Sequence, residues 1–325
     1  MTNREPSLSV GMTVYNGQRY LSAALGSLLS QDFEDFELVV VDDGSTDASP
    51  DILARVAKRD ARVRVIRQDN AGISAAANRM IAETRAPLIA RMDADDLAKP
   101  GRLTAQVAFM QGEGAGVAAA GCAVEYIDAK DRFLTTIRPP CDDATIQSML
   151  LQGHCAVWHT GSILRRDAVE KVGGYSADLR YAIDLDLWLR LGEVGALANL
   201  PGAWQRYRMH PGGVSETKRD IQEEDARTAV RRAGERRGVD AVFEETPWRP
   251  GSDRASRQAF HLQFGWWAYH SGERSTAAIY GLKAAAAKPW SIRGWRLAAK
   301  AVLTSPGPGS RSGSDARDGP DAAGR

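Results

Sequence analysis

Two pairs of aspartates follow apolar runs within the first hundred residues. Asp42 and Asp43 come after the run 36–41, and Asp93 and Asp95 come at the end of the run 87–92. Mg²⁺ and Mn²⁺ prefer such carboxylate oxygens, whereas zinc favours nitrogen and sulfur ligands. Carboxylates two positions apart in a loop can turn toward one point. Asp93 and Asp95 therefore form a candidate divalent-cation site, although a solvated or helix-capping acidic turn has the same sequence.

A divalent cation at this place suits the transfer of a sugar from a nucleotide diphosphate. The leaving group is then a diphosphate, and the cation neutralises the charge that develops on it. The carboxylates of Asp42 and Asp43 can accept hydrogen bonds from a ribose hydroxyl or a base N–H. Residues 45–47 are N-cap candidates for the next helix. Capping does not require both Asp42 and Asp43, which leaves them for a nucleoside.

A third acidic pair, Asp184 and Asp186, precedes an apolar helical segment at 187–191. The dipole at a helix N-terminus favours the ionised carboxylate, and an aspartate there is also commonly a cap. An inverting sugar transfer needs one carboxylate on the far side of the sugar from the leaving group, where it takes the proton of the acceptor hydroxyl. An aspartate at the start of this helix is a candidate for that role.

The segments between these aspartates alternate between strand and helix patterns. We expect strands at 8–14, 36–41, 62–66 and 87–92, and helices at 20–29 and 72–84. This order implies right-handed βαβ crossovers and an open α/β sheet. Ligands of such sheets bind at the carboxyl ends of the strands. The first two aspartate pairs should therefore face one crevice.

Composition and charge exclude several classes of protein. The 325 residues are 43% hydrophobic and 26% charged, typical of a globular protein with two domains, and 42 Lys and Arg balance 41 Asp and Glu. No field of one sign is expected to attract nucleic acid. Cys122, Cys141 and Cys155 lack a C-x-x-C pairing, which indicates reduced thiols. Without a signal peptide or a long apolar run, we predict a cytoplasmic protein.

The chain is predicted to have three parts. They are an α/β domain at 1–215, a helical region at 216–305 and a disordered tail at 306–325. The helical region should hold helices at 216–236, 254–271, 274–287 and 290–303. Its tryptophans alternate with basic residues, and aromatic residues at helical spacing usually form a core. The alternative is peripheral contact with an anionic membrane at its inner face, which a lipid-linked acceptor would make useful.

Other nucleotide-binding folds fit the sequence less well. A Rossmann dehydrogenase needs G-x-G-x-x-G in the first turn, where this chain has Val-Tyr-Asn-Gly at 14–17, and a P-loop needs Gly-Lys-Ser/Thr, which is absent. A nucleotidyltransferase would show a glycine-rich basic loop near the N-terminus. One alternative from another class stays open: a non-catalytic nucleotide-sugar-binding protein or scaffold of a glycan assembly complex.

Several segments resemble, in order and spacing, the signatures of family 2 glycosyltransferases. They are 9–17, 36–47, 70–78, 92–96, 173–175, 181–190 and 207–215. The resemblance implies a GT-A-type, Rossmann-like mixed sheet flanked by helices, and inverting transfer with Mn²⁺ or Mg²⁺. It also implies a UDP-, GDP- or dTDP-sugar donor and a glycan or lipid-linked acceptor. Cell-envelope or exopolysaccharide synthesis would be the setting.

The resemblance also implies roles for single residues. The nucleotide sugar would be bound by Thr13, Tyr15, Asn16, Asp42, Asp43, Asp93 and Asp95, with Tyr15 stacked on the base. Asp95 and His210 would hold the metal, Asp184 would be the catalytic base, and His159 and Asp186 would lie on the acceptor side. The chain departs from the family at Ile183, where a glutamate is usual, which leaves the acceptor open. Thr13 replaces a proline and Ala77 an arginine.

Overall fold

The computed structural model describes residues 5–210, 218–244 and 253–304, and it divides the chain into two compact units. Of the described residues, unit 1 contains 5–124, 139–207 and 218–244, and unit 2 contains 125–138, 208–210 and 253–304. Helix α9 (Arg219–Arg237) is in unit 1, although we predicted it in the C-terminal region. Its Ala229 and Val230 are buried in the same core as Trp188. The predicted tail lies outside the described residues.

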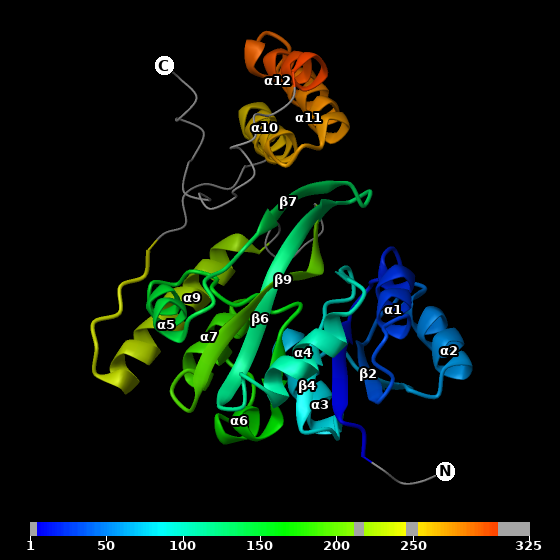
Figure 1. The fold of residues 1–325 in the computed structure, drawn as a ribbon, viewed down its shortest axis with the longest axis vertical. Coiled ribbons are helices and arrows are strands. Elements are labelled where there is room, and N and C mark those ends of the chain that lie inside the picture. The colour runs from blue at the N-terminus through cyan, green and yellow to red at the C-terminus, as the bar shows by residue number, and fades with distance from the viewer. Residues whose placement is uncertain (1–4, 211–217, 245–252, 305–325) are drawn as a thin grey trace. The chain divides into compact units, whose positions relative to one another are not determined.

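Half of the central sheet is parallel, in the order β3, β2, β1, β4. These strands are β1 (Leu8–Val14), β2 (Phe36–Asp43), β3 (Val63–Gln68) and β4 (Leu88–Arg91). Every residue of β2 is buried, because a parallel sheet is covered on both faces. The four predicted strands are confirmed (Figure 1). Strand β2 runs two residues further than predicted, so Asp42 and Asp43 are its last two residues and not part of the loop.

The other half of the sheet is antiparallel, with β8 beside β4, followed by β6, β9 and β5. The strands are β5 (Leu97–Ala98), β6 (Val117–Asp128), β8 (Ile163–Arg165) and β9 (Ala196–Met209), and β7 (Phe133–Ile137) pairs with β6. The sheet is therefore mixed, as expected.

Helices cover both faces of the parallel half. Helices α1 (Leu21–Leu29), α2 (Ser49–Arg59) and α4 (Arg102–Gln111) share a core with the β1 residues Leu8, Val10 and Met12. Helix α3 (Ile73–Glu83) covers the other face, against Val41 and Ile89. It packs so closely that a Cβ on Gly11 would lie 2.1 Å from Met80 Sδ, so a larger residue there would require the Met80 side chain to move. Helices α5 (Asp143–Leu151), α6 (Arg166–Lys171) and α7 (Ile183–Leu191) form a second core with α9.

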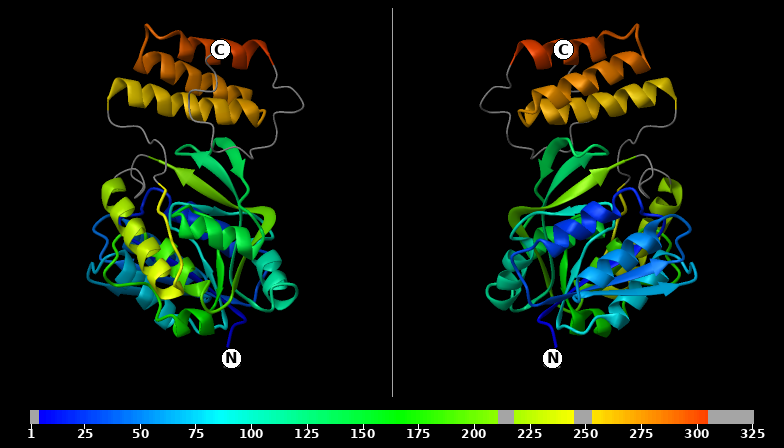
Figure 2. Two further views of the ribbon diagram at one scale, coloured as in Figure 1. Left: turned by 90° about the vertical axis from the view of Figure 1, so that its left-hand side faces the viewer. Right: turned by 90° about the vertical axis from the view of Figure 1, so that its right-hand side faces the viewer.

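Unit 2 consists mainly of three helices that lie side by side (Figure 2). They are α10 (Arg254–His270), α11 (Arg274–Ala287) and α12 (Ile292–Leu303). Helices α11 and α12 touch through glycine, since a Cβ on Gly281 would lie 2.5 Å from Ala298 N. Phe264 and Tyr280 are buried with Leu134, so part of the aromatic set forms a core as expected. Within the described residues, no helix combines the length and the apolar character needed to cross a membrane.

Candidate active site

A buried arginine organises the carboxyl end of β4. Arg91 is 2% exposed, and its guanidinium donates to Met92 O at 2.6 Å and to Thr13 Oγ1 at 3.0 Å. It also pairs with Asp93 Oδ1 at 3.1 Å. A buried cation is unfavourable unless it is paired, so Arg91 fixes the orientation of Asp93. Our sequence analysis missed this residue, although a charge inside an apolar, fully buried strand was a signal that could have revealed it.

The aspartates that end β2 bind backbone groups of neighbouring loops. Asp43 Oδ1 accepts from Ala71 N at 2.9 Å and Oδ2 accepts from Gly72 N at 3.0 Å. Asp42 Oδ1 accepts from Ser45 N at 3.1 Å. Each carboxylate oxygen can accept two hydrogen bonds, so Asp43 Oδ2 can still bind a nucleoside while it holds the loop. Both aspartates lie at the strand end where a nucleoside contact was predicted.

The predicted capping of α2 by residues 45–47 is wrong. The N-cap is Ala48, whose side chain makes no capping hydrogen bond. Asp47 is one residue earlier, and its Oδ2 accepts from Gln18 N at 3.0 Å while Oδ1 accepts from Ser49 N at 2.9 Å. These polar residues therefore join the turn after β2 to the loop after β1.

Asn16 and Tyr15 occupy that loop after β1 and differ in what they expose. Asn16 has a φ of 53°, and its Oδ1 accepts from Thr46 N at 2.8 Å, so its carboxamide helps to shape the loop. Tyr15 is 57% exposed. An exposed ring beside a strand end is what base stacking requires. The sequence-based role of Asn16 in nucleotide binding stays a prediction.

Asp93 and Asp95 both follow β4 and are partly exposed. Among the described residues, no three His, Cys, Asp or Glu side chains form a ready cation site. Mg²⁺ is commonly held by one or two carboxylates together with substrate phosphates and water, so a pair of aspartates fits such an ion. Asp93 is paired with Arg91, and Asp95 as the direct ligand stays a prediction. His210 belongs to unit 2, and its part in metal binding stays a prediction.

Asp184 is electrostatically coupled to Asp93. It lies in the first turn of α7, where its Oδ1 accepts from Leu185 N at 2.9 Å. The pKa of Asp184 is raised to about 6, mainly by burial and to a smaller extent by the negative charge of Asp93, while backbone hydrogen bonds act to lower it. Two aspartates far apart in the sequence therefore interact electrostatically in the fold. A carboxylate with this pKa is ionised at neutral pH and is a stronger base than an ordinary aspartate.

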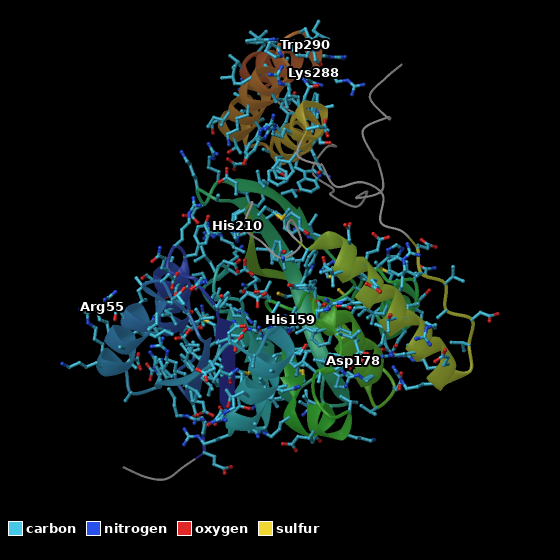
Figure 3. All side chains as sticks on the ribbon, turned by 180° about the vertical axis from the view of Figure 1, so that it is seen from behind. Arg55, His159, Asp178, His210, Lys288 and Trp290 are labelled. Carbon is cyan, nitrogen blue, oxygen red and sulfur yellow. The ribbon has the colours of Figure 1, made fainter. Side chains whose placement is uncertain are left out.

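His159 and Tyr175 form a neutral hydrogen-bonded pair near these charges. His159 Nε2 and Tyr175 Oη are 2.7 Å apart, and His159 is labelled in Figure 3. Burial lowers the pKa of His159 to about 3, helped by the charge of Arg91. Burial raises the pKa of Tyr175 to about 12, and the charges of Asp93 and Asp184 also act on it. The pair therefore offers polar groups without net charge, as a hydroxyl-bearing acceptor would need.

The backbone of Tyr175 is held by Asn78 on α3. Asn78 Nδ2 donates to Tyr175 O at 2.8 Å, and Asn78 Oδ1 accepts from Tyr175 N at 2.8 Å. This double contact needs a close approach, because a Cβ on the neighbouring Gly174 would lie 2.5 Å from Asn78 Oδ1. The sequence segments 70–78 and 173–175 were singled out, but this connection between them was not.

Asp186 is buried and bound to other side chains, and it neither caps α7 nor faces a site where an acceptor could bind. It is 1% exposed, and its Oδ2 accepts from Arg190 Nε at 2.8 Å and from Ser176 Oγ at 2.5 Å. Arg190 in turn donates to Gly174 O at 2.6 Å. The N-cap of α7 is Ala182. Asp186 therefore supports the 173–175 turn that carries Tyr175, which corrects the expectation of an acceptor-side role.

We expect Asp186→Ala to lower the free energy of unfolding by about 3 kcal/mol, because it leaves the largely buried Arg190 without its carboxylate. Asp178→Ala is the matched control: Asp178 pairs with Arg232 at the surface, and such pairs contribute about 1 kcal/mol or less. Urea denaturation of both variants measures the difference. Equal, small losses would show that the Asp186 pair has no special structural role.

The mixed sheet with helices on both faces is the fold of GT-A glycosyltransferases, and solved structures of this class superpose on the chain. Staphylococcus aureus TarS 1–349 in complex with UDP-GlcNAc superposes with a TM-score of 0.58 over 91% of this chain and 88% of that chain, at 16% identity. The mannosyltransferase PcManGT of Pyrobaculum calidifontis, in complex with GDP-Man and Mn²⁺, gives 0.52 over 93% and 81% at 18% identity.

The model of glycosyl transferase family 2 matches residues 9–173, and the chain belongs to this family. An uncharacterized glycosyltransferase of Haemophilus influenzae is 28% identical over 70% of this chain and 72% of its own length. The putative teichuronic acid biosynthesis glycosyltransferase TuaG of Bacillus subtilis is 27% identical over 67% of this chain and 85% of its own length. The family resemblance and the fold inferred from the sequence are therefore confirmed.

Proposed function

We propose that the chain is an inverting glycosyltransferase that moves a sugar from a nucleotide diphosphate to an acceptor hydroxyl in the synthesis of an envelope polysaccharide. The observation that carries the proposal is the buried carboxyl of Asp184, whose pKa is raised by burial and, to a smaller extent, by the charge of Asp93 in the D-x-D segment. TuaG, named for teichuronic acid biosynthesis, supports a polysaccharide product. UDP-GlcNAc in TarS and GDP-Man in PcManGT support a nucleotide-sugar donor.

The donor would bind at the carboxyl ends of β1, β2 and β4. Tyr15 would stack on the base. The hydroxyl of Thr13 would donate a hydrogen bond to the nucleoside or accept one from it, and the carboxylate of Asp43 would accept one. Asp95, with His210, would hold Mn²⁺ or Mg²⁺, and the ion supplies charge neutralisation for the diphosphate leaving group. Mn²⁺ in PcManGT supports this choice of cation. Arg91 keeps Asp93 oriented beside the ribose.

The acceptor would approach between Asp184 and the His159–Tyr175 pair. Asp184 takes the proton of the acceptor hydroxyl as its oxygen attacks the anomeric carbon, and the bond to the diphosphate breaks on the opposite face. Because His159 stays neutral, it can orient a hydroxyl without competing for the proton. A glycan or lipid-linked acceptor fits this arrangement, and a location at the inner face of the membrane would bring the chain to the latter.

A thermal-shift screen of nucleotide sugars with Mn²⁺ tests donor binding. A donor that binds only the folded chain raises the melting temperature by mass action, and we expect a shift for one UDP-, GDP- or dTDP-sugar and none for the free sugar. A release assay for the nucleoside diphosphate with acceptor glycans then tests turnover. Binding without turnover on any acceptor would favour a nucleotide-sugar-binding scaffold, and no binding at all would contradict both functions.

The pH profile tests Asp184 as the base. Its pKa of about 6 predicts that kcat/KM rises with pH through this value, because only the ionised carboxylate accepts a proton. Below it the carboxyl is protonated and activity is lost about tenfold per pH unit. Initial rates between about pH 5 and pH 8 measure this limb. A rate that stays flat to about pH 5 would exclude a base with the raised pKa.

A further inference from the structure

Unit 2 contains a pocket of about 510 Å³ between α10 and α11 whose polar lining is entirely basic. Arg254, Arg257 and His261 come from α10, and Lys283 comes from α11. Among the described residues, no aspartate or glutamate lines the pocket. In the part of the chain that the structure describes, neither Arg254 nor Arg257 has a carboxylate partner within ion-pair distance. The pocket therefore gathers cationic groups without internal compensation.

The basic groups of the pocket act on one another. Burial, together with the charges of Lys283 and Arg257, lowers the pKa of His261 to about 4. Burial also lowers the pKa of Lys283, helped by Arg132 and opposed by Asp128. Mutual repulsion among partly desolvated cations is relieved when an anion binds between them. Arginine and lysine are the side chains that most often bind phosphate, and the pocket contains two arginines and one lysine.

The remaining lining residues of the pocket are apolar, and exposed apolar side chains follow them in the sequence. These lining residues are Ala286, Ala287, Pro289 and Trp290. Trp290 is 69% exposed, and Lys288 and Trp290 lie at the same end of the helices (Figure 3). Ile292 and Trp295 follow, 75% and 52% exposed. Tryptophan beside basic residues is typical of surfaces that rest at the boundary between lipid headgroups and acyl chains.

The charge of these helices favours a membrane lipid over a neutral ligand. Residues 253–304 contain eight Lys and Arg against two Asp and Glu, although the whole chain is nearly balanced. A pocket that is lined by both basic and apolar residues, and is far larger than inorganic phosphate, matches a phosphate with an apolar substituent. We propose that it binds the phosphate group of an anionic membrane lipid, with Trp290 against the lipid and Arg254, Arg257 and Lys283 on the phosphate. This site would hold the chain at a membrane whether or not unit 1 transfers a sugar.

Sedimentation of the full chain with lipid vesicles tests the proposal. We expect binding to vesicles of phosphatidylcholine with phosphatidylglycerol and little binding to phosphatidylcholine alone. Arg254→Glu/Arg257→Glu should reduce the partition coefficient at least tenfold, and Trp290→Ala should reduce it severalfold. A circular-dichroism melt of each variant confirms that it is folded. Equal binding to both vesicle types, or full binding by the charge-reversed pair, would overturn the proposal.

A matched control separates the pocket from overall charge. Arg55, labelled in Figure 3, and Arg59 are exposed on α2 of unit 1. The variant Arg55→Glu/Arg59→Glu changes the net charge by the same amount as Arg254→Glu/Arg257→Glu. This variant should keep its binding within about twofold, since only local charge attracts the lipid. An equal loss in the control would show diffuse attraction and overturn the pocket. Competition distinguishes the source: short-chain phosphatidylglycerol should displace vesicles, whereas displacement by glycerol phosphate at the same concentration would identify a soluble phosphate as the ligand.

Discussion

Asp184→Asn is expected to reduce kcat by about a thousandfold while donor affinity stays near that of the native chain. The amide cannot take the proton of the acceptor hydroxyl, and this proton transfer belongs to the transition state and not to donor binding. The amide oxygen can still accept from Leu185 N, so the start of α7 is preserved. Single-turnover rates at saturating donor, with calorimetry for donor affinity, measure the two effects separately.

The stability of the same variant separates a base from a structural aspartate. Folding raises the pKa of Asp184 above its ordinary value, so the protonated form is favoured in the fold, and ionisation as pH rises through about 6 costs stability. Removing the charge should therefore leave the melting temperature at neutral pH unchanged or higher. Asp178→Asn makes the same chemical change at the surface and should keep full activity. Equal activity in both variants would remove Asp184 from the mechanism.

The parallel half of the fold could be predicted because its strands are short segments rich in apolar and β-branched residues. Leu8–Val14 and Phe36–Asp43 are almost entirely buried, which is typical of strands in a parallel sheet covered on both faces. The antiparallel half carries no comparable signal. Strand β8 has three residues and β5 two, and β9 alternates between buried and partly exposed positions. Each of them pairs with a strand that is distant in the sequence, β8 with β4 and β5 with β9, and no local pattern shows such pairing.

The residues of the candidate site also fall into two groups, those that the sequence predicts and those that only the fold reveals. Asp93 and Asp95 were found because acids directly after a buried strand are conspicuous, and Asp184 because it begins an apolar helix. Arg91, Asn78 and Tyr175 were missed as site residues because their partners are distant in sequence: Tyr175 meets Asn78 and His159 only in the fold. The same holds for Asp186, whose partners Arg190 and Ser176 turn it into a support for a loop. Types and spacing predict where chemistry can occur, but not which polar groups the fold uses for itself.

Asp95→Ala is expected to weaken Mn²⁺-dependent donor binding at least tenfold, because Asp95 is the carboxylate proposed to hold the ion on the diphosphate and the variant loses it. Asp93 cannot fully replace it while it is paired with Arg91 at 3.1 Å. Calorimetric titration with UDP-GlcNAc and with GDP-Man, each with Mn²⁺ and with EDTA, measures the effect. For the donor that binds, the native chain should lose affinity in EDTA to about the level of the variant.

The variant in EDTA makes this prediction decisive. If Asp95 acts through the cation, chelation should change the affinity of Asp95→Ala far less than that of the native chain, because the metal contribution is already missing. If the losses add in full, Asp95 contacts the donor without a metal, and the D-x-D segment has another role. Asp178→Ala, an exposed aspartate on a different loop, should respond to EDTA as the native chain does. Metal dependence that persists unchanged in Asp95→Ala would place the ion on other residues.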